Sequence, residues 1–386
     1  MVESFSPTPS AGRPLVYAHL GDLHVTDAKA RNYLDFLAML VQLEVECGDR
    51  LDFLYLPGDV ADNGRPEQYR LVAAALRLVS APVYAISGDH DMEGGSLAAF
   101  YAGLGAAPLP LAVEVRGVRC LFLDVCGPGQ GGPDFRLGAP QLAWLGEQLR
   151  QVPTGTEVAL FMHTYPADLR DTTERQHVTA LLAQHRVALV DMGHTHYNEL
   201  ANGGATIYAA TRSTGQIEEG PVGYSLTSLD GGIVSWRFKP LDSGFPFVLI
   251  TAPADYRLLR HQSQIVTNQF TIRAVVFGAQ LVEAVVYWLD DGPRLPLHLT
   301  TQGVWQAEAT AATASRTLTV EAQDATGRLG RHRIELARGP YQPLGQGSEG
   351  SDAASIGAWE ANGILGTQLG PNRNAKPLHH LSSTSS

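Results

Sequence analysis

The sequence predicts a layered α/β domain followed by a small all-β domain. Up to about residue 86, short apolar runs alternate with stretches whose apolar residues recur at helical spacing. This alternation is typical of strands and helices packed in layers. From about residue 245 to 338 the helical period disappears, and short alternating segments are separated by turns such as Asp291-Gly292-Pro293. That spacing indicates a β-sandwich of roughly 90–100 residues.

The first part of the chain contains three short apolar runs, each of which ends in polar residues. We expect strands at residues 15–20, 51–56 and 82–86. Apolar residues at helical spacing predict helices between them, over 28–46 and about 66–79.

The order of elements changes after residue 110. A Gly/Pro-rich loop is expected at 127–133, and helices are expected at 139–151 and about 173–185. The remaining apolar runs predict strands at 111–115, 118–125, 157–162, 187–190, 205–210, 222–229 and 232–238.

These patterns divide the chain into four segments. We expect a loose Ser/Pro-rich N-terminus at 1–13, a first domain at 14–240 and the β-sandwich at 245–338. Residues 339–386 are rich in Gly, Ser, Pro and Asn, so we expect a mostly disordered tail there, from which Ala358-Trp359 and Ile364-Leu365 could dock on another part of the molecule.

Composition limits the classes of partner. The chain has 386 residues and a formal net charge of −11, which argues against a nucleic-acid polymer as partner. It has no uncharged apolar run long enough to span a membrane and no basic leader followed by an apolar stretch. Three cysteines imply no disulfide framework. We therefore expect a cytoplasmic protein without membrane partners; a homo-oligomer is compatible with the sequence.

Polar clusters follow five of the expected strands. In open α/β sheets, ligands bind beyond the carboxyl ends of the strands. Carboxylates with imidazoles are ligands of Zn, Fe, Mn or Ni rather than of Ca. One metal ion rarely takes so many protein ligands, whereas two ions that share a carboxylate would use them. The clusters are Asp22/His24, Asp59/Asp62, Asp89/His90/Asp91, His163 and His194/His196.

Together these segments resemble the calcineurin-like metallophosphoesterase family over about residues 14–240, because the five clusters occur in that family's order. The resemblance implies an α+β fold, a four-layer αββα sandwich with two metal ions at the sheet edge. Here the C-terminal all-β domain, of the immunoglobulin or fibronectin kind, would follow it. Each cluster alone has a simpler explanation, such as a helix cap, a polar turn or a core histidine.

The resemblance also implies a role for each residue. Asp22, His24 and His196 would hold the first metal ion, and His163, His194 and Asp89 the second. Asp59 would bridge the two ions, which would be divalent or trivalent Mn, Fe, Zn or Ni. A hydroxide between the ions would be the nucleophile that attacks phosphorus in line with the leaving group.

Three further residues are candidates for the chemistry. His90 is not needed as a ligand and could donate a hydrogen bond or a proton to the leaving oxygen. Asp91 is expected to hold the His90 imidazole in orientation and to raise its pKa. Arg212 could contact a phosphate, the alternative being a salt bridge. Asp62 and His19 are expected to support the ligands rather than to bind metal.

The chain departs from the family pattern at Asp89, where the family usually has Asn. An ionised Asp89 would bring the net charge of a site with two divalent ions, two further carboxylates and a hydroxide from about +1 to about 0. Such a site should attract a dianionic monoester less than a monoanionic diester. It should also bind the second ion more strongly.

We therefore expect a metal-dependent hydrolase of phosphoric esters, most specifically a phosphodiesterase of small phosphoester substrates. A phosphomonoesterase or nucleotidase using the same site is the first alternative. A non-catalytic scaffold that keeps the fold is the second. The histidines outside the clusters, His332 among them, are interpreted as surface or tail residues.

Overall fold

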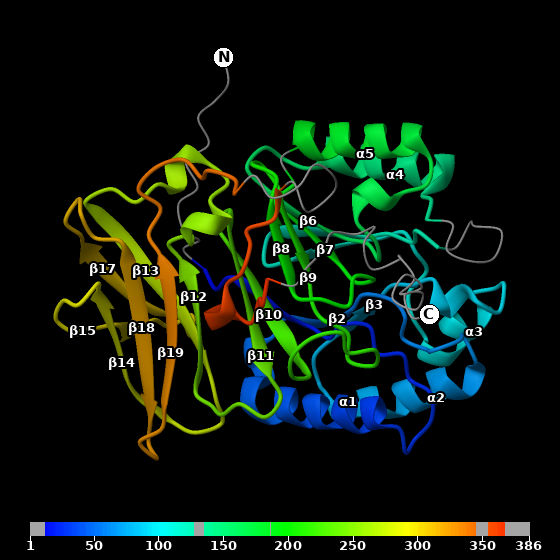
Figure 1. Ribbon diagram of the computed structural model, residues 1–386, viewed down its shortest axis with the longest axis horizontal. Helices are drawn as coiled ribbons and strands as arrows, with labels where there is room; N and C mark the ends of the chain where they lie inside the picture. Colours follow the sequence, from blue (N-terminus) through cyan, green and yellow to red (C-terminus); the bar gives the residue numbers. More distant parts are fainter. Residues whose placement is uncertain (1–11, 127–134, 186, 345–353, 367–386) are drawn as a thin grey trace, which may run out of the picture.

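The structure is a computed structural model that describes residues 12–126, 135–185, 187–344 and 354–366. Two β-sheets lie face to face between two groups of helices, and a β-rich region lies beside them (Figure 1). This confirms the predicted fold class. Among the described residues, no helix is both long and apolar enough to cross a membrane.

The first sheet has five strands. Its order is β11 (Ile233–Pro240), β10 (Gly223–Asp230), β1 (Leu15–His19), β2 (Phe53–Leu56) and β3 (Val83–Ala85). Strands β1, β2 and β3 run parallel, so their carboxyl ends reach the same edge of the sheet.

The second sheet has six strands. Its order is β4 (Leu111–Val115), β5 (Val118–Phe122), β6 (Glu157–Phe161), β7 (Leu189–Met192), β9 (Ile207–Ala210) and β8 (Glu199–Asn202). Strands β5, β6 and β7 are parallel. Strand β8 was not predicted; it forms an antiparallel edge hairpin with β9.

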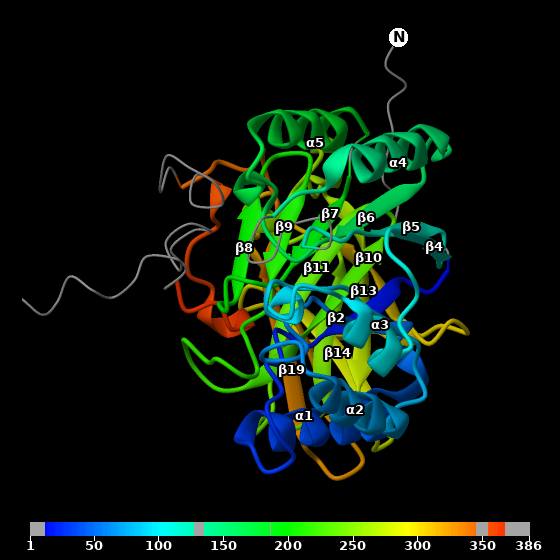
Figure 2. The same ribbon diagram turned by 90° about the vertical axis from the view of Figure 1, so that its right-hand side faces the viewer.

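Helices cover the outer faces of both sheets. In Figures 1 and 2, α4 and α5 lie on one side of the sheets and α1, α2 and α3 on the other. The helices are α1 (Arg31–Gln42), α2 (Pro66–Ala75), α3 (Ala98–Leu104), α4 (Gly138–Gln151) and α5 (Thr172–His185). Short helical turns span Leu43–Cys47, Gly48–Arg50, Leu76–Leu78, His90–Met92, Pro166–Asp168, Tyr256–Leu258, Gln262–Gln264 and Glu360–Asn362.

Aromatic side chains fill the space between the two sheets. Tyr17 stacks on Phe53 at 4.7 Å between ring centroids, and Phe122 stacks on Phe161 at 4.5 Å. Because side chains alternate along a strand, the neighbours Val16 and Ala18 of Tyr17 face the helices instead. The two-sided burial explains why these strands are apolar throughout.

The C-terminal region contains two further antiparallel sheets. One has the order β12 (Phe247–Ala252), β13 (Gln269–Phe277), β17 (Trp305–Thr310) and β16 (His298–Leu299). The other has the order β15 (Leu295–Pro296), β14 (Val282–Leu289), β18 (Thr317–Asp324) and β19 (Leu329–Glu335). This agrees with the predicted all-β region.

Residues 354–366 differ from the expected disordered tail. Ile356, Trp359 and Ile364 are buried, and they join the same hydrophobic cluster as Trp236 of β11. Part of the tail is therefore ordered, because three apolar side chains within a polar stretch pack on the body of the molecule. We refer to residues 354–366 as the C-terminal strap.

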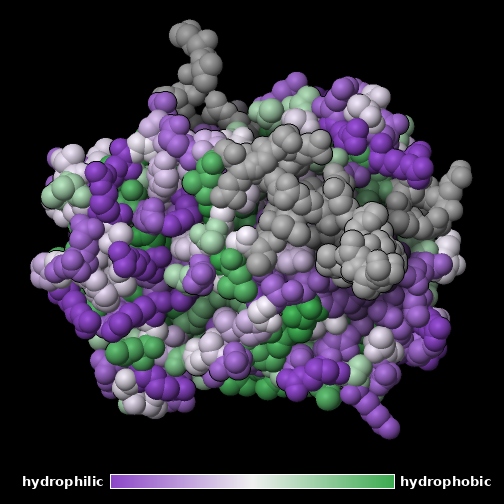
Figure 3. All heavy atoms as spheres, viewed as in Figure 1, coloured by the Kyte–Doolittle hydropathy of each residue, from purple (hydrophilic) through white to green (hydrophobic). Residues whose placement is uncertain are grey.

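The face of the molecule in Figure 3 is mostly hydrophilic, and its apolar residues form scattered groups. Exposed apolar side chains of the described residues include Leu34 and Val41 on α1. The expected Gly/Pro loop at 127–133 lies outside the described residues.

Candidate metal centre

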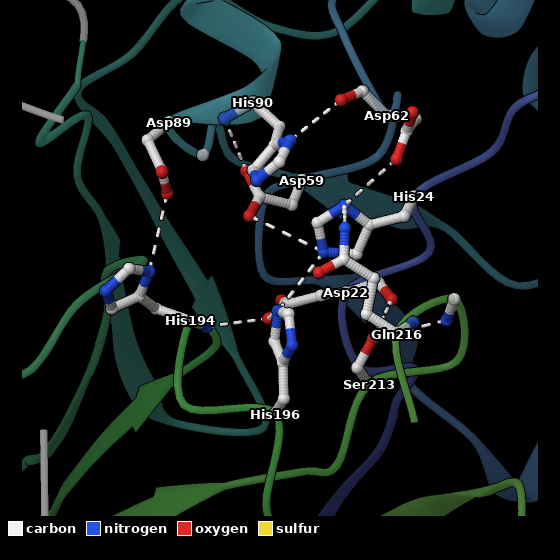
Figure 4. Close-up of polar contacts among 12 residues, drawn as sticks. Asp22, His24, Asp59, Asp62, Asp89, His90, His194, His196, Ser213 and Gln216 are labelled. Carbon is white, nitrogen blue, oxygen red and sulfur yellow. Dashed lines mark hydrogen bonds and ion pairs between the residues drawn. The ribbon is translucent and has the colours of Figure 1, made fainter. Parts of the chain in front are cut away.

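Loops after five parallel strands bring the predicted ligands to one edge of the two sheets. Figure 4 shows several of these side chains pointing toward one another. Asp22 and His24 follow β1, Asp59 follows β2, Asp89 follows β3, His163 follows β6, and His194 and His196 follow β7.

One group consists of Asp22, His24, Asp59 and His196, whose ligand atoms lie within 4.8 Å of one another. His24 Nε2 is 3.2 Å from His196 Nε2, and His196 Nε2 is 3.5 Å from Asp22 Oδ2. His24 Nε2 is 3.7 Å from Asp59 Oδ2.

The second group consists of Asp89, His163 and His194. Asp89 Oδ1 lies 3.1 Å from His163 Nε2 and 3.4 Å from His194 Nδ1. Asp59 Oδ2 is also 3.5 Å from His163 Nε2, so this one carboxylate lies between the two groups.

The donor set fits two cations. Asp22 and Asp59 are almost fully buried, and Asp22 Oδ1 has no hydrogen-bond partner among the described residues. Two buried carboxylates without a compensating cation would be costly. Burial lowers the pKa of both His24 and His196 to about 4, so both imidazoles are neutral near pH 7. Neutral imidazoles and ionised carboxylates are the states that bind metal ions.

Hydrogen bonds orient the ligands. His163 Nδ1 donates to the carbonyl oxygen of Pro57 at 2.7 Å, which turns Nε2 toward Asp89. The backbone amide of His194 donates to Asp22 Oδ2 at 2.7 Å and thereby links the two sheets at the site.

The backbone of the site is held in an unusual conformation. Positive φ angles occur at His24 (43°), Asp59 (47°), His194 (65°) and His196 (62°). Non-glycine residues rarely adopt this left-handed region, and such strain concentrates at functional sites. No sequence pattern signals it.

His90 lies beside the first group, with its ring centroid 4.6 Å from that of His24. Its Nδ1 donates to the backbone carbonyl of Asp62 at 2.7 Å, which leaves Nε2 free to face a ligand. Burial disfavours the charged imidazolium, but the charges of Asp59 and Asp89 and the bond to Asp62 outweigh it and raise the pKa of His90.

The predicted contact between Asp91 and His90 is wrong. The Asp91 carboxylate points into the protein and accepts hydrogen bonds from the amides of Ala61 (3.0 Å) and Gly88 (3.0 Å). Adjacent residues of one turn point in different directions, so the spacing could not reveal the partner. Burial and the charge of Asp59 raise the pKa of Asp91 to about 7.

Arg212 does not point toward the ligands. Its side chain is 1% exposed, lies 3.4 Å from Glu219 and stacks over the ring of Phe238. The guanidinium therefore has no free face for a phosphate, so the predicted contact between Arg212 and a phosphate is wrong.

Two predicted supporting residues have distinct surroundings. His19 Nδ1 lies 2.8 Å from Asp191 Oδ1, between the two sheets and away from the ligands. Asp62 Oδ1 lies 3.8 Å from His24 Nδ1, which is beyond hydrogen-bond distance. Asp62 instead supports His90, through its backbone carbonyl.

Sequence analysis missed Ser213 and Gln216. Ser213 Oγ donates to the backbone carbonyl of Asp22 at 2.8 Å, and Gln216 Nε2 lies 3.2 Å from His24 Nδ1. With Asn32, Gln216 also lines a cavity of about 300 Å³ next to His24. These residues follow β9 at the same edge as the ligands, which is the signal that could have identified them.

Comparison with known proteins gives a consistent picture. Residues 15–198 match the family model described as calcineurin-like phosphoesterase. A cAMP/cGMP dual specificity phosphodiesterase of Mycobacterium tuberculosis is 31% identical over 200 residues, which cover 47% of this chain and 62% of that protein. The chain thus spans less than two thirds of that relative's length.

Two further proteins illustrate the similarity. A glycerophosphodiester phosphodiesterase of Enterobacter lignolyticus is 27% identical over 209 residues, or 47% of this chain and 71% of that protein. A solved dimetal phosphatase from Danio rerio shares 14% identity with a TM-score of 0.49, over 59% of this chain and 96% of that chain.

Proposed function

Because residues 15–198 belong to the calcineurin-like phosphoesterase family, we propose that the chain is a metal-dependent phosphodiesterase that hydrolyses small phosphoesters. The observation that carries this proposal is the position of Asp59, whose Oδ2 lies 3.7 Å from His24 Nε2 and 3.5 Å from His163 Nε2. A carboxylate that lies between two groups of ligands suits a pair of metal ions.

Each group of ligands would hold one ion. Asp22, His24 and His196 would hold the first, and Asp89, His163 and His194 the second, with Asp59 between them. Mn, Fe, Zn and Ni all suit this mixture of carboxylates and imidazoles. When bound, two such ions lower the pKa of water and neutralise the charge that develops on the phosphoryl oxygens.

His90 would act on the leaving group. Its Nδ1 is held by the Asp62 carbonyl, which presents Nε2 beside His24, and its pKa is raised. A histidine in this state can donate a proton to the departing oxygen near neutral pH.

Asp89 favours a diester as substrate. Burial alone would raise the pKa of Asp89, but the adjacent imidazoles of His163 and His194 outweigh it and lower that pKa, so the carboxylate is ionised at neutral pH. The extra negative charge reduces attraction for a dianionic monoester more than for a monoanionic diester. The relatives described above are named for diester substrates.

Three further features are proposed for the whole chain. The first domain would extend over 14–240 and the β-sandwich over 245–338, each with its own sheets.

Three free, buried cysteines suit a reducing cytoplasm. The net charge of −11 disfavours a nucleic-acid polymer as substrate.

The test begins with metal analysis of the purified chain and reconstitution with Mn²⁺. Phosphomonoesters, linear diesters and cyclic nucleotides are then assayed with and without a chelator. We expect chelator-sensitive hydrolysis of diesters that exceeds that of monoesters. Hydrolysis of monoesters alone would favour the monoesterase, and two bound ions without hydrolysis of any ester would favour the scaffold.

A further inference from the structure

We propose that the C-terminal strap positions the loops that carry His196 and Asp22, and that Asn198 and Arg212 are the positioning residues through which it acts. This inference rests on the proposed function, because it concerns the same ligand loops. The strap lies outside the residues that match the family model.

The strap is packed firmly on the body of the molecule. Trp359 and Ile364 pair through two backbone hydrogen bonds of 2.8 and 3.2 Å, and both side chains are buried. Asn362, which is 1% exposed, donates from Nδ2 to the carbonyl oxygen of Trp236 at 2.8 Å. In Figures 1 and 2 the strap, in orange-red, lies beside β8 and β11. It therefore presents a rigid surface to the adjacent loops.

One backbone carbonyl of the strap holds two buried side chains of the first domain. Gly363 O accepts from Arg212 Nη2 at 2.7 Å and from Asn198 Nδ2 at 2.9 Å. Asn198 Oδ1 in turn accepts from the backbone amide of Arg212 at 2.9 Å. The strap, Asn198 and Arg212 thus form a closed set of hydrogen bonds.

Further hydrogen bonds connect Asn198 and Arg212 to the loops that carry the metal ligands. Asn198 is two residues after His196, and Ser213, which follows Arg212, donates its backbone amide to the His196 carbonyl at 3.3 Å. Ser213 Oγ donates to the Asp22 carbonyl at 2.8 Å. The strap is therefore connected through Asn198 and Arg212 to both loops.

Loss of one of these hydrogen bonds should displace the metal ligands, because the groups that form them are buried. Arg212 and Asn198 are each 1% exposed. A buried donor left without its acceptor is costly, so the loops would rearrange to recover a partner. Metal ligands tolerate displacements of only about half an ångström. Residues that support ligands typically contribute about 10–100-fold to metal affinity.

The chain offers a control residue at the other end of β8, the strand that begins directly after Asn198. Asn202 of β8 is also buried, and its Nδ2 donates to the carbonyl oxygens of Arg257 and Leu259 at 2.8 and 2.9 Å. Its Oδ1 accepts from the amide of Gly204. Asn202→Ala removes three side-chain hydrogen bonds, one more than Asn198→Ala removes, but at the opposite end of β8, away from the ligand loops.

The experiment compares the full-length variants Asn198→Ala, Trp359→Ala and Asn202→Ala with the wild type. Metal-free protein is titrated with Mn²⁺ by calorimetry, and its unfolding temperature is measured. We expect Asn198→Ala and Trp359→Ala to bind Mn²⁺ at least about 10-fold more weakly. Asn202→Ala should bind within about twofold of the wild type at a similar loss of unfolding temperature. If Asn198→Ala does not fold, the Mn²⁺ affinity of Trp359→Ala tests the proposal instead, because the Trp359 side chain packs within the strap and away from the ligand loops.

Equal Mn²⁺ affinity in Asn198→Ala and the wild type would overturn the proposal, as would an equal loss in all three variants. Mn²⁺ binding needs no substrate, so it separates this proposal from the proposed function. A wild type that binds Mn²⁺ but hydrolyses no ester contradicts only the proposed function. A wild type that binds none of Mn²⁺, Fe²⁺, Zn²⁺ and Ni²⁺ contradicts both.

Discussion

Asp91 accepts a hydrogen bond from the Tyr69 hydroxyl at 2.8 Å, in a buried position between α2 and the loop after β3. The same carboxylate accepts from the amides of Val60, Ala61 and Gly88. It thus joins the loop that carries Asp59 to the loop that carries Asp89. A residue that sequence spacing assigned to His90 instead holds two ligand loops together.

Replacement of Asp91 by Asn should therefore destabilise the protein and weaken metal binding. An amide group offers one acceptor oxygen, so at least one buried amide would lose its partner at a cost of about 1–3 kcal/mol. Urea denaturation of the metal-free protein measures that cost. Tyr69→Phe removes a single hydrogen bond and should cost about 1 kcal/mol. Wild-type stability and Mn²⁺ affinity in Asp91→Asn would contradict this role.

Asp89→Asn should shift the substrate preference toward monoesters. The substitution removes one negative charge, so the net charge of the site with its metal ions becomes about one unit more positive. A more positive site attracts a dianionic ester more than a monoanionic one. The ratio of kcat/KM for an aryl monoester to that for the matched aryl diester should rise. Mn²⁺ affinity should fall, because Asp89 lies 3.1 Å from His163 Nε2 within the second group. An unchanged ratio would show that the charge at this position does not set the preference.

His90→Asn should lower kcat by about 10²–10⁴-fold without loss of bound metal, the range typical of a general acid. The loss should be smaller for an ester with an acidic leaving group, such as 4-nitrophenol, than for an alkyl ester, because such a group departs without a proton. His177→Asn, on the exposed face of α5, is the control and should leave kcat unchanged. A similar loss for both leaving groups would argue against proton donation by His90.

His332 should make the protein less stable in mild acid. It was interpreted as a surface residue, but it is 3% exposed: Nδ1 accepts from the amide of Ile250, and Nε2 faces Asn362 Oδ1. Burial, with the nearby charge of Arg237, lowers its pKa well below 6.5. The folded protein thus favours the neutral imidazole, so stability is present above pH 6.5 and is lost as the pH falls below it.

The size of that effect follows from linkage. A single such histidine costs about 1.4 kcal/mol of unfolding free energy per pH unit below 6.5, until its folded-state pKa is reached. The stability difference between wild type and His332→Gln should therefore change by about 2 kcal/mol between pH 6.5 and 5. His298→Gln, at an exposed position of β16, should follow the wild-type pH dependence. Parallel curves for the wild type and His332→Gln would contradict the assignment.

Those parts of the protein that depend on local pattern were predictable from the amino-acid sequence. Buried parallel strands are continuous apolar runs, and the polar residues that end them must meet at one sheet edge. The strand pattern therefore predicted five polar clusters at one edge, and the resemblance to a family selected seven ligands from them. The structure brings these seven into two adjacent groups: Asp22, His24, Asp59 and His196 in one, and Asp89, His163 and His194 in the other.

The hydrogen-bond partners of the remaining side chains depend on the three-dimensional packing of distant segments. Asp91 and Arg212 point away from the site because neighbouring segments supply amides, carbonyls and Glu219 in directions that spacing does not encode. Trp359 and Ile364 were candidates for docking, but their place on the molecule was not predictable, because only contact with distant β11 and β8 gives the strap a buried site. Hydrogen-bond partners more than a hundred residues apart depend on the packing of whole sheets, which no local pattern contains.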